Sequence, residues 1–138
     1  MEKVLLPIDL AHSEKAEEIL KEAKKLAEGR DVSLMVVHIL SPLPGFVTAE
    51  LPEDFAHRAV DDAKTQLLDM IKTHKLGPST EVLIRSGNPQ HEIVSLAKEK
   101  GIDLIIIASH KPGMADYLLG SVAAAVVRHA PCSVLVKR

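Results

Sequence analysis

The sequence predicts an α/β fold: an open parallel sheet with helices on both of its faces. Short apolar runs rich in β-branched residues, which are typical of buried strands, alternate with longer segments whose apolar residues recur at helical spacing. The resulting order is β-α-β-α-β-α-β-α-β, and strand–helix–strand units of this kind form parallel sheets through right-handed crossovers. Apolar residues make up 46% of the chain and are nearly all aliphatic, which suits a sheet packed between helices.

In the first third of the chain, the pattern indicates a strand, a helix and a second strand. The first strand is expected at 4–8, ends at Asp9, and is followed by a helix that Ser13 caps. Helical spacing of the apolar residues gives this helix one inward face. Gly29 lies just past its end as a C-cap. The β-branched run at 32–40 is the second strand.

The middle of the chain begins with an irregular stretch at 41–53, where several prolines and a glycine disfavour a regular element. A helix is expected from about Asp54 to His74, and a third strand, closer to an edge of the sheet, at 80–85. The apolar residues expected to face inward on this helix are Val60, Ala63, Leu67, Leu68 and Ile71. A further helix begins near Pro89 and closes at Gly101.

The C-terminal part combines a strand, a polar loop, a helix and a final strand. The strand at 104–108 leads into a loop containing Gly and Pro, and Gly120-Ser121 opens an Ala/Val-rich helix that Pro131 stops. A second β-branched run at 133–136 follows. A helix N-terminus presents unpaired N–H groups and a partial positive charge, so it is a natural place for a phosphate.

Length and composition restrict the function. The 138 residues are expected to form one domain, 1–138. A net charge of −2 gives no general attraction to nucleic acid or membranes, and the lack of Trp, with one Tyr and two Phe, argues against base stacking. No apolar run approaches the roughly 20 residues of a membrane span. The lone Cys132 makes no internal disulfide, so we expect a cytoplasmic protein in which this residue has a packing role.

In open parallel sheets, ligands lie beyond the carboxyl ends of the strands, where the strand order reverses. At that edge, Gly120 allows close approach of the backbone, while the Ser121 hydroxyl and the N–H groups of Ser121 and Val122 face an anion. The alternative is that Ser121 merely caps the helix. The cation Lys111 favours the phosphate interpretation.

Two further residues have two interpretations each. Asp9 either holds ribose hydroxyls or Mg²⁺, or caps the first helix. His110 either contacts phosphate or is an exposed loop histidine. Other nucleotide and hydrolase sites are excluded, since the chain has no Gly-x-Gly-x-x-Gly after the first strand, no Walker A motif and no Gly-x-Ser-x-Gly elbow. No histidine pair has the spacing of a zinc site.

The chain resembles the universal stress protein family over essentially its whole length. The segments that carry the resemblance are VLLPID at 4–9, GNP at 87–89, DLII at 103–106, LGSV at 119–122 and VRHAPCSVLV at 127–136. The resemblance implies an adenine nucleotide alpha hydrolase-like fold, with a five-stranded parallel sheet of order 3-2-1-4-5. It also implies an ATP-binding module of the stress response.

Carried over by position, the resemblance implies a set of nucleotide contacts. Backbone groups of Pro7, Ile8 and Ile39 would frame the adenine, and Asp9 would meet the ribose or a metal. The phosphate path would be lined by Ile107, Ala108, His110 and Lys111, and closed by Gly120, Ser121 and Val122. The implied ligand is ATP, or ADP or AMP, with Mg²⁺.

The chain departs from the phosphate pattern of the ATP-binding members, which is a Gly, two residues, a second Gly, nine residues, and Gly-Ser or Gly-Thr. Ala108 stands in place of the first Gly and Lys111 in place of the second, as in the subgroup with a Ser-His-Arg/Lys-Pro loop. A cation at Lys111 would replace the bond lost with the glycine.

The resemblance also implies a homodimer through the last strand, 133–136, and leaves tetramers open. This agrees with an apolar strand at a sheet edge, whose unpaired backbone groups invite a partner. Two other functions stay open: a homodimeric interaction protein that binds no nucleotide, and a slow ATPase or autophosphorylating protein. No catalytic residue is assigned.

Overall fold

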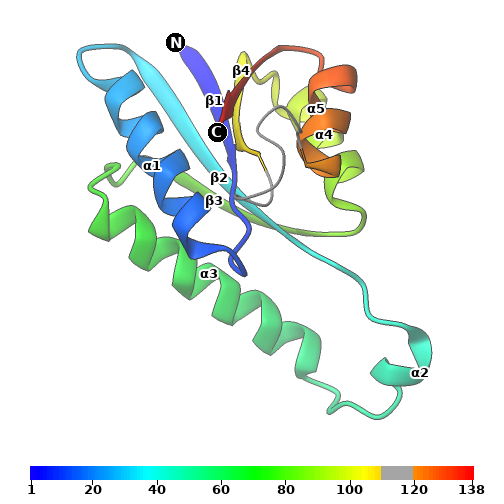
Figure 1. The fold of residues 1–138 in the computed structure, drawn as a ribbon. Helices are drawn as coiled ribbons and strands as arrows, with labels where there is room; N and C mark the ends of the chain where they lie inside the picture. Colours follow the sequence, from blue (N-terminus) through cyan, green and yellow to red (C-terminus); the bar gives the residue numbers. More distant parts are fainter. Residues whose placement is uncertain (110–119) are drawn as a thin grey trace.

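The computed structural model describes residues 1–109 and 120–138 as one parallel sheet of five strands, with helices on both faces (Figure 1). The strands are β1 Glu2–Pro7, β2 Val32–Leu40, β3 Glu81–Ser86, β4 Leu104–Ala108 and β5 Ser133–Lys137. The helices are α1 Ser13–Ala27, α2 Gly45–Thr48, α3 Phe55–Thr73, α4 Pro89–Lys100 and α5 Ser121–His129. The strand order is β3-β2-β1-β4-β5, so the predicted fold class and the implied order 3-2-1-4-5 are confirmed.

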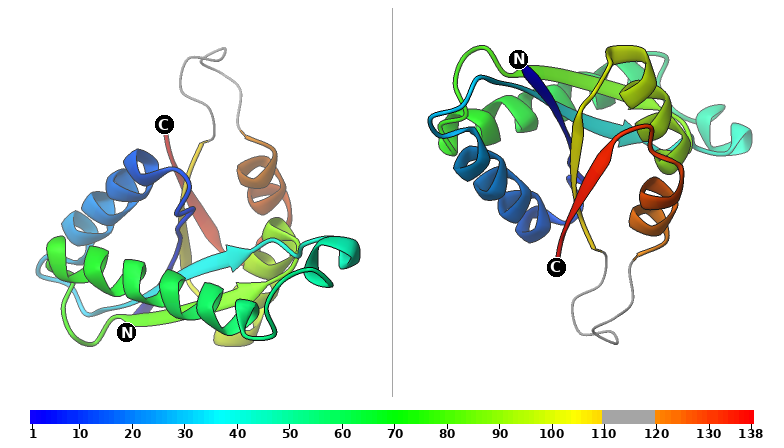
Figure 2. Two further views of the ribbon diagram at one scale, coloured as in Figure 1. Left: turned by 90° about the horizontal axis from the view of Figure 1, so that it is seen from below. Right: turned by 90° about the horizontal axis from the view of Figure 1, so that it is seen from above.

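The two faces of the sheet carry separate apolar cores. Successive side chains of a strand point to opposite faces, so Val4 and Leu6 of β1 pack on one side and Leu5 on the other. Helices α1 and α3 cover the first face, and α4 and α5 cover the second (Figure 2). The central strands are therefore apolar on both faces, as parallel sheets require.

The topology places a reversal of strand order between β1 and β4. The chain winds from β1 through β2 to β3 at one edge, then returns to β4 beside β1 and ends at β5 on the other edge. Right-handed crossovers put the helices of the first half on one face and those of the second half on the other. The carboxyl ends of β1 and β4 are thus adjacent where the two helical layers diverge.

Three local expectations differ from the structure. Ser13 is the first residue of α1 rather than its cap, because the side chain of Asp9 accepts the N–H of Ala11 and holds the chain in a turn up to His12. The stretch at 41–53 includes the single helical turn α2. Leu68 is 53% exposed, because the neighbouring Leu67 points straight at the sheet and the next helical position is rotated away.

We predict that Leu67→Ala lowers the free energy of unfolding by about 2–5 kcal/mol, because it removes buried methyl groups and leaves a cavity. Leu67 is fully buried beneath α3, whereas the adjacent Leu68 is largely exposed. Leu68→Ala is the matched control and should change the stability by about 0.5 kcal/mol or less. Urea denaturation measures both, and equal effects of the two substitutions would contradict this packing of α3.

Candidate functional site

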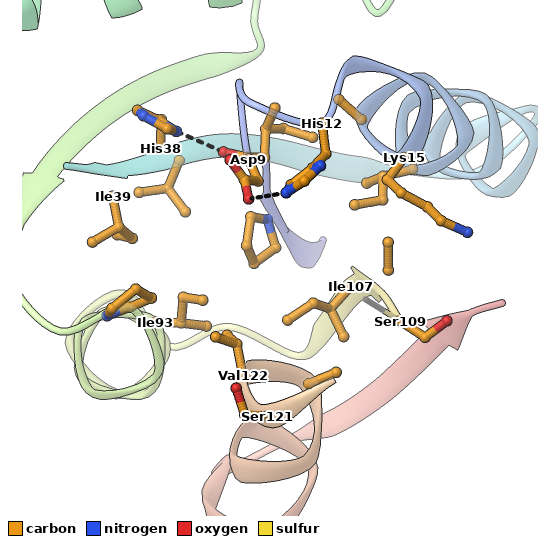
Figure 3. A pocket seen from close by; sticks show the side chains of 18 of the residues that line it. Asp9, His12, Lys15, His38, Ile39, Ile93, Ile107, Ser109, Ser121 and Val122 are labelled. Atoms are coloured by element: carbon orange, nitrogen blue, oxygen red, sulfur yellow. Dashed lines mark hydrogen bonds and ion pairs between the residues drawn. The ribbon is translucent and has the colours of Figure 1, made fainter. Parts of the chain in front are cut away.

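A pocket of about 260 Å³ lies at the carboxyl ends of β1, β2 and β4, with further walls from α1, α4 and α5 (Figure 3). The residues predicted from the sequence that line it are Pro7, Ile8, Asp9, Ile39, Ile107, Ala108, Ser121 and Val122. Gly120 directly precedes Ser121 as the N-cap of α5. His110 and Lys111 lie outside the described residues, so their phosphate contacts stay predictions.

Helix α5 begins at the pocket without a side-chain cap. Its N-cap is Gly120, whose carbonyl accepts the N–H of Ala124 at 2.9 Å in the first intrahelical bond. The N–H groups of Ser121 and Val122 precede any intrahelical acceptor, and the described part of the chain shows no other acceptor for them. Ser121 is the first helical residue rather than the cap, so its hydroxyl is left to face the pocket (Figure 3).

Helix α4 also begins at the pocket, but its own residues satisfy part of its first turn. The side chain of Asn88 accepts the N–H of His91 at 3.2 Å, and Pro89 at the start of the helix has no N–H to offer. Pro89 and Ile93 therefore contribute an apolar wall. Of these two helices, α5 is the one whose start has no side-chain cap.

The turn after β1 is held by hydrogen bonds to β2 and within itself. The N–H of Ile8 donates to the carbonyl of Val37 at 2.8 Å, and Nδ1 of His38 donates to the carbonyl of Ile8 at 2.8 Å. The carboxylate of Asp9 accepts the N–H of Ala11 at 3.0 Å through Oδ1. Its second oxygen, Oδ2, lies 3.7 Å from Nε2 of His12 at the pocket.

The backbone of Ile39 faces the pocket beyond the end of β1. Successive residues of a strand direct their N–H and C=O groups to alternate neighbouring strands. Val37 faces β1, since its carbonyl accepts from Ile8, so Ile39 faces the same side. The β1–β2 pairing ends at Pro7 and Val37. The N–H and C=O of Ile39 therefore point to the side where β1 has already ended, and no residue of β1 pairs with them.

The pocket is apolar along its walls and polar at its rim. Ile93 and Ile107 are almost fully buried and belong to the core between the sheet and α4 and α5. Lys15 of α1 adds a positive charge at the rim. Its side chain is 19% exposed, and its Nζ is 3.6 Å from a carboxylate oxygen of Glu18.

Several lining residues were not among the nucleotide contacts predicted from the sequence. The polar ones are His12, Lys15, His38, Ser41 and Ser109, and the apolar ones include Pro89 and Ile93. The available signal was topological: in a parallel sheet, every helix that follows a strand begins at the carboxyl edge. The first turns of the helices after β1 and β3 were therefore candidates as well as that of the last helix.

Residues 1–109 and 120–138 also bear on two other kinds of function, metal binding and membrane insertion. These residues include no group of three or more His, Cys, Asp or Glu side chains arranged to hold a metal ion. No helix within them combines the length and hydrophobicity needed to cross a bilayer. Burial raises the pKa of the Cys132 thiol, and the nearby Asp103 carboxylate adds to the rise, so the unreactive thiol form is favoured.

Comparison with known proteins agrees with this architecture. The model of the universal stress protein family matches residues 1–138. The chain belongs to the universal stress protein family. It is 30% identical to universal stress protein G of Shigella flexneri, over 98% of this chain and 97% of that protein. The solved structure of universal stress protein UspA from Lactobacillus plantarum is 28% identical, with a TM-score of 0.73, and the match covers 99% and 97% of the two chains.

Two solved relatives of this universal stress protein are described as nucleotide complexes. One is a universal stress protein in complex with cAMP, 22% identical with a TM-score of 0.68, over 99% of this chain and 96% of that chain. The other, from Archaeoglobus fulgidus, is in complex with dAMP, 23% identical with a TM-score of 0.65, over 100% and 98%. At these identities the likeness shows a shared fold.

Proposed function

We propose that this universal stress protein is an ATP-binding module of the stress response, with the nucleotide in the pocket described above. The observation that carries the proposal is the uncapped start of α5. The N–H groups of Ser121 and Val122 and the Ser121 hydroxyl offer donors to a phosphate at the positive end of a helix. Charge-assisted hydrogen bonds are worth about 1.5–3 kcal/mol each, so several together are sufficient for micromolar binding.

The adenine would lie against Ile39. Adenine carries an amino donor beside a ring-nitrogen acceptor. The C=O and N–H of Ile39, for which the described residues show no partner, are the complementary pair. The apolar side chains of Ile107 and Val122, with Pro7 and Ile8 nearby, suit a flat base. The relatives in complex with cAMP and dAMP support an adenine nucleotide as the ligand class.

The ribose and phosphates would extend from there toward α5. Oδ2 of Asp9 would accept hydrogen bonds from the ribose hydroxyls, or serve as a carboxylate ligand of Mg²⁺ whose other ligands are phosphate oxygens and water. Ala108, His110, Lys111 and Gly120 would border the phosphate path. ADP or AMP would occupy the same site with fewer of these contacts.

We predict that the purified protein binds ATP with micromolar affinity in the presence of Mg²⁺, and that Ser121→Ala weakens binding about tenfold or more. The hydroxyl supplies one charge-assisted bond to phosphate, and 1.4 kcal/mol corresponds to a factor of ten. Isothermal titration calorimetry measures both dissociation constants. The control is Ser79→Ala, because Ser79 is exposed in the loop before β3, at the opposite edge of the sheet.

The absence of any heat at millimolar ATP, with Mg²⁺ present, would contradict the proposal. Together with an intact dimer, that result would favour an interaction protein that binds no nucleotide. A different outcome is that the protein slowly releases ADP from ATP. If this activity persists through extensive repurification and vanishes in Ser121→Ala, the protein is also a slow ATPase.

We propose further that the module is a cytoplasmic homodimer joined through β5. This strand lies at the edge of the sheet, and its apolar residues Val134, Leu135 and Val136 are only partly covered. The carbonyl of Lys137 accepts the N–H of Ser109 on the β4 side, so by alternation the backbone of Val136 faces the open edge. An open edge of this kind pairs readily with a second strand.

We predict that Val136→Pro converts the dimer to a monomer without unfolding it. Proline removes an N–H that faces outward, and edge strands tolerate proline at such positions. Light scattering coupled to size-exclusion chromatography gives the mass of each variant, and circular dichroism checks the fold. A folded Val136→Pro variant that keeps the dimeric mass would contradict pairing through this edge.

A further inference from the structure

We propose that His38 is a positioning residue: through the carbonyl of Ile8, it aims the Asp9 carboxylate at the ribose of the bound nucleotide. It thereby sets the preference for nucleotides that carry ribose hydroxyls. This inference rests on the proposed function, because it concerns how the same pocket distinguishes its ligands. His38 lies at the pocket, but its Nδ1 is engaged by the carbonyl of Ile8, so it acts on Asp9 through the turn that bears this residue (Figure 3).

Two consecutive residues of β2 hold Ile8 from both sides of its backbone. The carbonyl of Val37 accepts the N–H of Ile8, and Nδ1 of His38 donates to the carbonyl of Ile8, both at 2.8 Å. The regular β1–β2 pairing has already ended at Pro7. The imidazole therefore takes the place of the next bond of the sheet and fixes the peptide unit that joins Ile8 to Asp9.

The direction of the Asp9 carboxylate depends on this backbone, because little packs around the side chain. It is 58% exposed, and its described polar contacts come from the turn itself. The N–H of Ala11 holds Oδ1, while Oδ2 lies at the pocket, 3.7 Å from Nε2 of His12 in the same turn. Hydrogen bonds to a ribose require an acceptor placed to within a fraction of an ångström. A looser turn would therefore weaken the bonds to the ribose more than the other contacts of the nucleotide.

The chemistry of the contact fixes the tautomer of His38. A carbonyl oxygen only accepts, so Nδ1 must carry a proton in the neutral ring as well as in the cation. An asparagine at this position would place an amide N–H close to where Nδ1–H lies, whereas a leucine would fill the space without a donor. Comparing these two substitutions separates the effect of losing the hydrogen bond from the effect of losing the volume of the ring.

The test measures dissociation constants for ATP and for 2′,3′-dideoxy-ATP by calorimetry. The native protein should prefer ATP about tenfold or more, because the analogue lacks the hydroxyls that reach Asp9. In His38→Leu this ratio should fall close to one, and in His38→Asn it should return toward the native value. The control Ile84→Ala truncates the residue beside His38 on β3 and should keep the native ratio.

A second measurement needs no nucleotide. Nitrogen-15 NMR of the ligand-free protein should show His38 protonated at Nδ1 when neutral, and hydrogen exchange of the Ile8 amide should be faster in His38→Leu than in His38→Asn. A ring protonated only at Nε2 would overturn the inference whatever the variants do, including a case in which His38→Leu fails to fold.

The possible failures are distinguishable. A native protein that binds neither nucleotide overturns the proposed function and this inference together. A native protein that prefers ATP, with the same preference in His38→Leu, overturns the inference alone and leaves the ATP site standing. Loss of the preference in Ile84→Ala as well would assign the effect to the sheet in general and overturn the role of His38.

Discussion

The site depends on the early end of the central strand. β1 stops pairing with β2 at Pro7 and Val37, while β2 continues to Leu40. Backbone groups of a strand must be paired or hydrated, so the missing neighbour leaves the end of β2 with a donor and an acceptor at Ile39. The same gap lets Ile107 at the end of β4 line the pocket and makes room for a ligand between the two helical layers.

The parallel architecture then determines what surrounds that gap. Each helix that follows a strand begins at the carboxyl edge, so the starts of α1, α4 and α5 converge on one pocket. Their local sequences give them different roles: Asn88 caps α4 with its own side chain, whereas Gly120 gives α5 no side-chain cap, and its first amides have no acceptor among the described residues. The polar turn at Asp9 is fixed to the sheet through Ile8. The result is an apolar pocket with the N-terminus of α5 at its rim and the Asp9 carboxylate beside it.

Much of this was predictable from the sequence, because strong local patterns and the topology agree. β-branched runs predicted the strands, and the rule that ligands lie at the reversal of strand order predicted the place of the pocket. Helix phase was harder to predict: of the neighbours Leu67 and Leu68, only the first is buried, and composition alone does not separate them. The contact of His38 with Ile8 was not predictable, because it joins residues that are distant in sequence, and a histidine in a strand has many possible roles. The roles of His110 and Lys111 stay predictions.

The central claim is that ATP binds to backbone groups at the C-terminal end of β2 and at the N-terminal end of α5. A titration of the nitrogen-15-labelled protein with ATP and Mg²⁺, followed by amide NMR, tests it directly. The amide resonances of Ile39, Ser121 and Val122 should show the largest chemical shift changes. These changes should saturate together, with the same dissociation constant in the micromolar range. The amide resonances near Ser79, at the opposite edge of the sheet, should not change. Unchanged amides at these three residues, or shifts that centre elsewhere on the protein, would contradict the account.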